Sequence, residues 1–238
     1  MNSTRKIAAI TGVIFIVATV AVLVANALTP VLTGTDYLTR FSAPTNQVAA
    51  GALLYLIGYF ACAGIAVVMY PVLKQWNAGL ALGSVVFRTI EAALYMVGLA
   101  CLLSLSTLGQ QFTSALAADR ASLQAVGDAL VSVRDHAALV AVFAFCLGAF
   151  MYYYLFFQSR LIPRWLSGFG IVAIVLMMAA CVLALFSGNR ITSYIPLAAP
   201  IALQEMVLAV WLIAKGFNLP ASASEAGKTE TNELVGVV

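Results

Sequence analysis

The sequence predicts an all-α, polytopic membrane protein: a bundle of six transmembrane helices with a short extracytoplasmic amphipathic helix. The first observation is composition, because 63% of the 238 residues are hydrophobic and only 9% are charged. A soluble domain is nearer half apolar and a quarter charged. The second is that six segments reach the roughly 20 mostly apolar residues that a helix needs to cross the hydrocarbon core. The third is that charges and helix breakers separate these segments.

The six predicted spans form one transmembrane domain within residues 1–219. Pro30 follows the first span, and the polar residues 74–77 separate the second from the third. Two arginines and a proline within residues 160–164 separate the fourth from the fifth, and residues 187–190 end the fifth. We expect the spans at residues 7–28, 48–73, 80–108, 137–157, 166–186 and 196–214.

The first span has an alternative interpretation as a cleaved signal peptide. A basic pair, Arg5-Lys6, precedes it, and Ala25-Asn26-Ala27 resembles a cleavage site made of small residues. However, the apolar stretch is longer than the roughly 7–15 residues of a signal-peptide core. We therefore expect a retained transmembrane helix.

The connection between the third and fourth spans, residues 109–134, is longer than a simple turn. Its apolar residues recur at helical spacing, which predicts a short amphipathic helix. This helix either lies on the outer surface or leads directly into the fourth span. It serves either to cap the bundle or, alternatively, as a lid over a substrate. The apolar positions are Leu116, Leu123, Val126, Leu130 and Val133.

The distribution of lysine and arginine predicts a cytoplasmic N-terminus, since short cytoplasmic loops carry an excess of these residues. An even number of spans then makes the C-terminus cytoplasmic as well. The tail at residues 220–238 has too little apolar surface to offset its ordering entropy, so we expect a disordered cytoplasmic tail. The inner side would hold Arg5, Lys6, Lys74, Arg160, Arg164 and Lys215, and the outer side Arg40, Arg120, Arg134 and Arg190. All three tryptophans would lie at the inner interface: Trp76, Trp165 and Trp211.

Ionisable residues occur deep within two predicted spans. Arg88 and Glu91 are three residues apart, which places them on one helix face. At about 1.5 Å per residue, they lie roughly 13 and 18 Å from the inner end of the third span. Glu205, in the sixth span, lies about 15 Å from its inner end by the same measure. If the two helices pack together, Arg88 can bridge both carboxylates.

These residues admit two principal interpretations. An unpaired charge at the bilayer centre costs about 2.5–3.5 kcal/mol on insertion scales, so pairing is expected. In the first interpretation, the protein is a structural or regulatory membrane protein, and the cluster is a clasp that only fixes helix packing. In the second, the cluster binds or helps to transport a proton, a cation or a small polar ligand, with Tyr95 and Gln204 as further contacts. A third hypothesis, a membrane-embedded enzyme, lacks an evident nucleophile–base set, so no catalytic residue is assigned.

Other chemistry finds little support in the sequence. His136, the only histidine, lies at the outer mouth of the fourth span, where it is either a solvated interfacial residue or a pH-sensitive group. One histidine and scattered cysteines assemble no metal-ligand set, and no nucleotide-binding motif indicates a cofactor. No basic cluster favours nucleic acid. The expected partner is the lipid bilayer, while protein partners cannot be named.

Four sequence blocks together resemble a bacterial family of multi-pass membrane proteins catalogued as domain of unknown function 4386. The resemblance extends over nearly the whole chain, to about Leu219. It implies an integral protein of about six helices in a bacterial plasma membrane, and it brings no activity or cofactor. Its polar pattern matches Arg88, Glu91, Gln204 and Glu205. The blocks are "RKIAAITGVIFIVATV", "FRTIEAALY", "RLIPRWLSGFGI" and "PIALQEMVLAVWLIAKGFN".

Overall fold

The computed structural model describes residues 3–43 and 45–218, and they are helical with no strand among them. Six helices are long and apolar enough to cross a membrane, as the sequence predicts. The predicted tail at residues 220–238 lies outside the described residues. The elements are α1 (Ser3–Leu28), α2 (Tyr37–Ser42), α3 (Thr45–Leu73), α4 (Ala78–Ser114), α5 (Ala117–Ser159), α6 (Arg164–Ser187), the 3₁₀ helix η1 (Ile191–Tyr194) and α7 (Ile195–Ala214).

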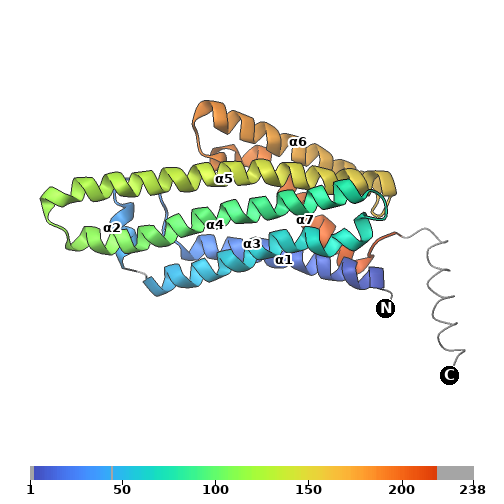
Figure 1. The fold of residues 1–238 in the computed structure, drawn as a ribbon, viewed down its shortest axis with the longest axis horizontal. Helices are drawn as coiled ribbons and strands as arrows, with labels where there is room; N and C mark the ends of the chain where they lie inside the picture. Colours follow the sequence, from blue (N-terminus) through green and yellow to red (C-terminus); the bar gives the residue numbers. More distant parts are fainter. Residues whose placement is uncertain (1–2, 44, 219–238) are drawn as a thin grey trace, which may run out of the picture.

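The six long helices form a closed ring. Going around it, the order is α1, α3, α4, α5, α6, α7 and back to α1, and each helix packs mainly against its two neighbours. All six run roughly along the long axis of the molecule (Figure 1). We call the end near Ser3 and Lys215 the terminal end, and the end with the α4–α5 turn the hairpin end. In this ring α4 and α7 stand on opposite sides.

Local chemistry at the terminal end sets the helix boundaries. Asn77 caps α4, because its side-chain oxygen accepts a hydrogen bond from the backbone N–H of Leu80 at 2.9 Å. Arg160 ends α5 in a left-handed conformation with φ of 57°. The Arg5 guanidinium of α1 donates to the last carbonyls of α7, including that of Leu212 at 2.9 Å and that of Ile213 at 2.7 Å. These carbonyls have no partner within the helix, so α1 completes the end of α7.

The α4–α5 hairpin is longer than the sequence predicts. The amphipathic stretch is not a separate surface helix; it is the first part of α5, which is one of the two arrangements left open above. With 43 residues, α5 is about 65 Å long, which exceeds the about 40–45 Å of a bilayer with its headgroups. The hairpin therefore projects beyond the other helices at one end of the bundle (Figure 1).

The short helix α2 fills the space beside this hairpin. Gly109 lets the backbone of α2 approach α4, since a Cβ there would lie 2.5 Å from the carbonyl oxygen of Leu38. The hydroxyl of Tyr37 donates to Asp128 of α5 at 2.6 Å. Burial, and then this hydrogen bond, raise the pKa of Tyr37 above its ordinary value.

The outer surface of the ring is apolar. Large aliphatic side chains are exposed along every span, for example Val20, Leu53, Leu82, Val140, Val175 and Leu203. A soluble monomer rarely exposes so continuous an apolar surface. The buried charged side chains of Arg88 and Glu91 line a cavity inside the ring instead. This inversion of surface and interior fits helices surrounded by lipid.

Candidate functional site

A cavity of about 470 Å³ lies inside the ring, and all six spans line it. Its volume falls within the roughly 300–1,000 Å³ typical of small-molecule sites. Arg88, Glu91 and Tyr95 of α4 face Glu205 of α7 across this cavity. One lining residue from each span, in chain order, is Thr19, Tyr59, Tyr95, Phe145, Met177 and Glu205.

Arg88 is held by three helices at once. Its Nη1 atom lies 2.8 Å from Oε2 of Glu91, one turn along α4. Its Nε–H donates to the backbone carbonyl of Cys62 on α3 at 3.2 Å. Its guanidinium carbon lies 4.9 Å from the centre of the Phe145 ring on α5, in cation–π geometry. Arg88 and Glu91 expose only 2% and 3% of their surfaces, so they form a buried, locally neutral pair.

A glycine on α5 makes room for this pair. A Cβ at Gly148 would lie 3.1 Å from Cβ of Phe87 and 3.2 Å from Cγ of Arg88. Both distances are shorter than ordinary van der Waals contact, which begins near 3.5 Å between carbon atoms. The absence of a side chain at Gly148 therefore lets α5 pack directly against the root of Arg88.

Glu205 is in a different state from Glu91. The ion pairs among the described residues join Arg88 to Glu91 and not to Glu205. Oε1 of Glu205 is buried, and the Tyr152 hydroxyl lies beside this carboxyl. The expected bridge from Arg88 to both carboxylates is therefore half formed, because α4 and α7 face each other across the cavity instead of packing together. An ionisable group without an ion pair is costly within a membrane, so this carboxyl favours a ligand that supplies a donor or a positive charge.

Three tyrosines form one wall between the charged pair and the hairpin end. The rings of Tyr59 and Tyr95 stack with centres 5.0 Å apart, and those of Tyr55 and Tyr59 stack at 5.6 Å. All three line the cavity. Tyr55 donates from its hydroxyl to the side-chain oxygen of Asn26 at 2.7 Å. This wall presents aromatic rings to the cavity, and the hydrogen bond between Tyr55 and Asn26 makes it polar toward the hairpin end.

Gln204 does not line the cavity. Its side chain is fully buried, and its amide nitrogen donates to the carbonyl of Leu166 on α6 at 3.1 Å. Its amide oxygen accepts a hydrogen bond from the Tyr153 hydroxyl of α5. Successive residues on a helix point about 100° apart, so Gln204 and its neighbour Glu205 serve different sides of α7. Gln204 ties α7 to α5 and α6.

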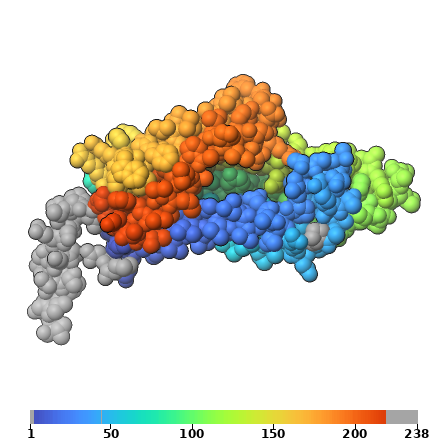
Figure 2. All heavy atoms as spheres, turned by 180° about the vertical axis from the view of Figure 1, so that it is seen from behind, coloured from blue at the N-terminus to red at the C-terminus, as the bar shows by residue number. Residues whose placement is uncertain are grey.

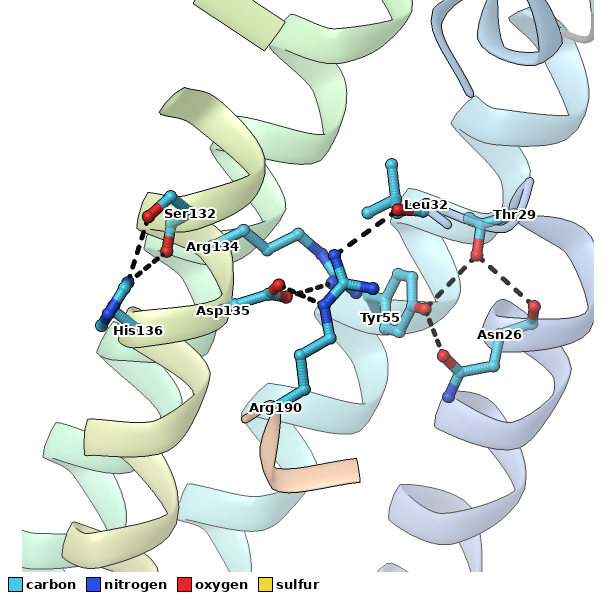
Figure 3. A network of polar contacts seen from close by, with 9 residues as sticks. All are labelled: Asn26, Thr29, Leu32, Tyr55, Ser132, Arg134, Asp135, His136 and Arg190. Atoms are coloured by element: carbon cyan, nitrogen blue, oxygen red, sulfur yellow. Dashed lines mark hydrogen bonds and ion pairs between the residues drawn. The ribbon is translucent and has the colours of Figure 1, made fainter. Parts of the chain in front are cut away.

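At the hairpin end, a network of charges joins α5 to the α6–α7 connection (Figure 3). The carboxylate of Asp135 lies 3.3 Å from Arg134 and 2.6 Å from Arg190. Arg190 also donates to the carbonyl of Leu32 at 3.4 Å, which joins the α6–α7 connection to the segment after α1. Arg134 lines the central cavity, so it is the positive group nearest the hairpin end of this space.

His136 faces a second, shallower pocket of about 580 Å³ at the hairpin end. Its Nδ1 atom lies 2.7 Å from the backbone carbonyl oxygen of Ser132. A carbonyl oxygen can only accept a hydrogen bond, so Nδ1 carries the proton of this bond. The ring is exposed and does not line the central cavity. A pH-sensitive role for His136 would therefore act at the hairpin end and not in the central cavity. Within residues 3–43 and 45–218, no three acidic, histidine or cysteine side chains gather closely enough to hold a metal ion.

Six apolar spans around a cavity that holds buried charges define a multi-pass integral membrane protein. The chain belongs to the family described as domain of unknown function (DUF4386), whose model matches residues 10–216, and this confirms the resemblance drawn from the four sequence blocks. No curated protein and no solved structure matches the chain.

Sequence reasoning identified four of the cavity's polar residues and missed the others. The structure brings Arg88, Glu91, Tyr95 and Glu205 into one space. The missed residues include Tyr55 and Tyr59, whose i, i+4 spacing places two tyrosines on one face of α3 and was a usable signal. Phe145 and Arg134 gave no such signal, because only the packing of α5 against its neighbours turns them toward the cavity.

Proposed function

We propose that the protein binds a proton or a small polar ligand within the membrane, at the central cavity, with Glu205 as the binding carboxyl. The observation that carries the proposal is that Glu205 lines the cavity and has no ionic partner among the described residues. Arg88 and Glu91 neutralise one another, so the third charge of the cluster is left to be balanced by a bound species. Intramembrane ionisable residues are expensive and are functional candidates for that reason.

The structural-clasp interpretation is favoured for one part of the cluster only. Arg88 and Glu91 are almost fully buried, and Arg88 also bonds to α3 and packs on α5. Their role is to join α3, α4 and α5 and to give the cavity a fixed wall. Tyr95, one turn beyond Glu91, supplies a hydroxyl and an aromatic face in the same space.

We also propose a location in a bacterial plasma membrane, with both ends of the chain in the cytoplasm. The terminal end carries Lys74, Arg164 and Lys215, next to Trp76 and Trp165. Basic residues mark the cytoplasmic side, and tryptophan favours the level of the headgroups. The hairpin end would then face outward.

An infrared titration of the protein in lipid nanodiscs tests the binding proposal. A carboxyl that takes up a proton gains a C=O stretching band, and hydrogen–deuterium exchange shifts that band. The proposal predicts such a band in the wild-type protein and its loss in Glu205→Gln. Asp119→Asn, in the first turn of α5 and remote from the cavity, serves as the matched control. If Glu205→Gln retains every carboxyl band of the wild type, Glu205 is not the proton-binding group.

A further inference from the structure

We infer that the central cavity takes amphipathic organic cations, molecules with an apolar body and one positive group, and that they enter from the bilayer between α1 and α7. This rests on the proposed function, since it assumes that the cavity binds a ligand at Glu205. It adds the chemical class of the ligand and the route by which the ligand arrives.

The route follows from how α1 and α7 pack. At the terminal end they are in close contact: a Cβ at Gly12 would lie 2.6 Å from the carbonyl oxygen of Ala209. Toward the hairpin end, Thr19 and Leu23 of α1 and Ala202 of α7 line the cavity. Because residues of both helices line the same cavity, we expect an opening between α1 and α7 in this half of the molecule.

A space-filling view shows this opening directly. A hollow lies between α1, in blue, and α7, in orange, and green atoms from the far side of the ring form its floor (Figure 2). Leu23 lines the cavity and exposes 62% of its surface, so an apolar side chain lies at the edge of this space. Such a rim faces acyl chains, so the cavity is open to lipid-dissolved molecules.

The charge of the ligand follows from the groups that face the cavity. Arg88 is neutralised by Glu91 at 2.8 Å. Arg134 lies 3.3 Å from Asp135, a carboxylate that it shares with Arg190 at 2.6 Å. Among the cavity-lining carboxyls, Glu205 has no ion pair within the described residues. An entering cation would therefore meet a carboxyl without an ion pair, while an entering anion would meet Arg88 and Arg134, each of which already has a carboxylate beside it.

The walls suit the body of such a molecule. The stacked rings of Tyr59 and Tyr95 present aromatic surface to the cavity, and aromatic faces attract cations with about 0.5–2 kcal/mol. Most of the other lining side chains are apolar, including Phe15, Leu99 and Met177. An apolar body would pack against these walls while its positive group faces Glu205.

Two ions of the same shape and opposite charge test the ligand class. Tetraphenylphosphonium is a lipophilic cation, and tetraphenylborate is the anion that matches it. Binding of each is measured by equilibrium dialysis against the full-length protein in nanodiscs of zwitterionic lipid, with empty nanodiscs subtracted. We expect saturable binding of the cation and none of the anion. Equal binding of both ions, or of neither, overturns the inference.

Glu205→Gln separates this outcome from the proposed function. Loss of a desolvated charge contact is expected to weaken tetraphenylphosphonium binding at least about tenfold, because each 1.4 kcal/mol is a factor of ten. Unchanged affinity contradicts the role of Glu205. If the infrared band depends on Glu205 but the cation does not bind, the proposed function stands and the ligand class is wrong. If Glu205→Gln does not fold, the comparison of the two ions in the wild-type protein still tests whether the cavity prefers a cation.

Two tryptophan variants test the route. Leu23→Trp places a large ring at the edge of the α1–α7 opening, and Leu53→Trp places the same ring on the lipid face of α3, outside the cavity lining. Stopped-flow mixing with tetraphenylphosphonium gives the rate constants. We expect Leu23→Trp to slow association and dissociation several-fold together, with little change in affinity, and Leu53→Trp to resemble the wild type. Identical rates in both variants contradict entry between α1 and α7.

Discussion

Arg88, Glu91 and Glu205 line one cavity but differ in what surrounds them. Arg88 and Glu91 share a close ion pair inside a packed wall, whereas Glu205 lines the cavity without an ion pair among the described residues. The same residue type, glutamate, is thus expected to stabilise the fold at one position and to bind a ligand at the other. Substitution of each carboxyl by its amide separates the two roles.

Glu91→Gln should destabilise the protein by about 3 kcal/mol, because it leaves a buried guanidinium without its counter-charge. Glu205→Gln should change the stability little, since no ionic partner is lost. Thermal unfolding in nanodiscs measures both variants. The double substitution Arg88→Met with Glu91→Leu is the control, because apolar side chains of similar size can replace a buried pair at low cost. Equal losses for the two glutamates would contradict this division.

Tyr37 gives the hairpin end a dependence on alkaline pH. The pKa of its hydroxyl is raised in the folded state by burial and by its bond to Asp128. A group whose pKa is raised by folding contributes stability below its unfolded value, near 10 for tyrosine, and this contribution is lost as pH rises through the folded value. Protection of the α2 amides from hydrogen exchange, taken relative to the intrinsic rate at each pH, should fall above about pH 10 in the wild type. In Tyr37→Phe this protection should be low at all pH values and show no alkaline step. An unchanged step would assign it to another group.

Close contacts between helices depend on the positions of glycines. At Gly148, α5 packs so closely against Phe87 and Arg88 that an added methyl group would push these neighbours away by a few tenths of an ångström. Gly148→Ala should therefore lower the free energy of unfolding by about 1–3 kcal/mol, as overpacking does. Gly64 of α3 is the matched control, because nothing lies within 4 Å of a Cβ placed there. Gly64→Ala should be neutral or stabilising by up to about 1 kcal/mol, from helix propensity alone. A stable Gly148→Ala would contradict tight packing at Arg88.

The sequence predicted the elements better than their arrangement. Hydropathy identifies six spans because the bilayer demands about 20 apolar residues from each, whatever their neighbours. It cannot reveal that α4 and α7 face each other across the ring, since nothing in either helix's own pattern specifies its neighbours. The helical period, by contrast, could have excluded Gln204 from the cavity once Glu205 was placed there, because adjacent residues point about 100° apart.

On the scale of the whole molecule, the ring makes α1 part of the cavity wall. Thr19 and Leu23 line the cavity, and Arg5 completes the carbonyl end of α7. A signal peptide removed after Ala27 would take away this wall. A retained first helix stays a prediction of the sequence.

Orientation is the second property of the whole molecule. Cysteines introduced at Leu116, in the α4–α5 turn, and at Trp76, in the α3–α4 turn, lie at opposite ends and are exposed. The four native cysteines, Cys62, Cys101, Cys146 and Cys181, are replaced by alanine in both variants. A membrane-impermeant maleimide added to intact cells should label Leu116→Cys and leave Trp76→Cys unlabelled until the membrane is opened. The reverse pattern would place the terminal end outside.

The central claim is that Glu205 is an unpaired carboxyl open to the bilayer, while Glu91 is shielded by Arg88. Dicyclohexylcarbodiimide, an apolar reagent that dissolves in lipid, tests it most directly. A protonated carboxyl adds across one C=N bond of the reagent, its proton moves to nitrogen, and rearrangement leaves a stable N-acylurea of added mass. Peptide mass spectrometry of the treated protein in membranes should find this adduct on Glu205 and not on Glu91. An adduct on Glu91 to the same extent, or on neither residue, would contradict the account.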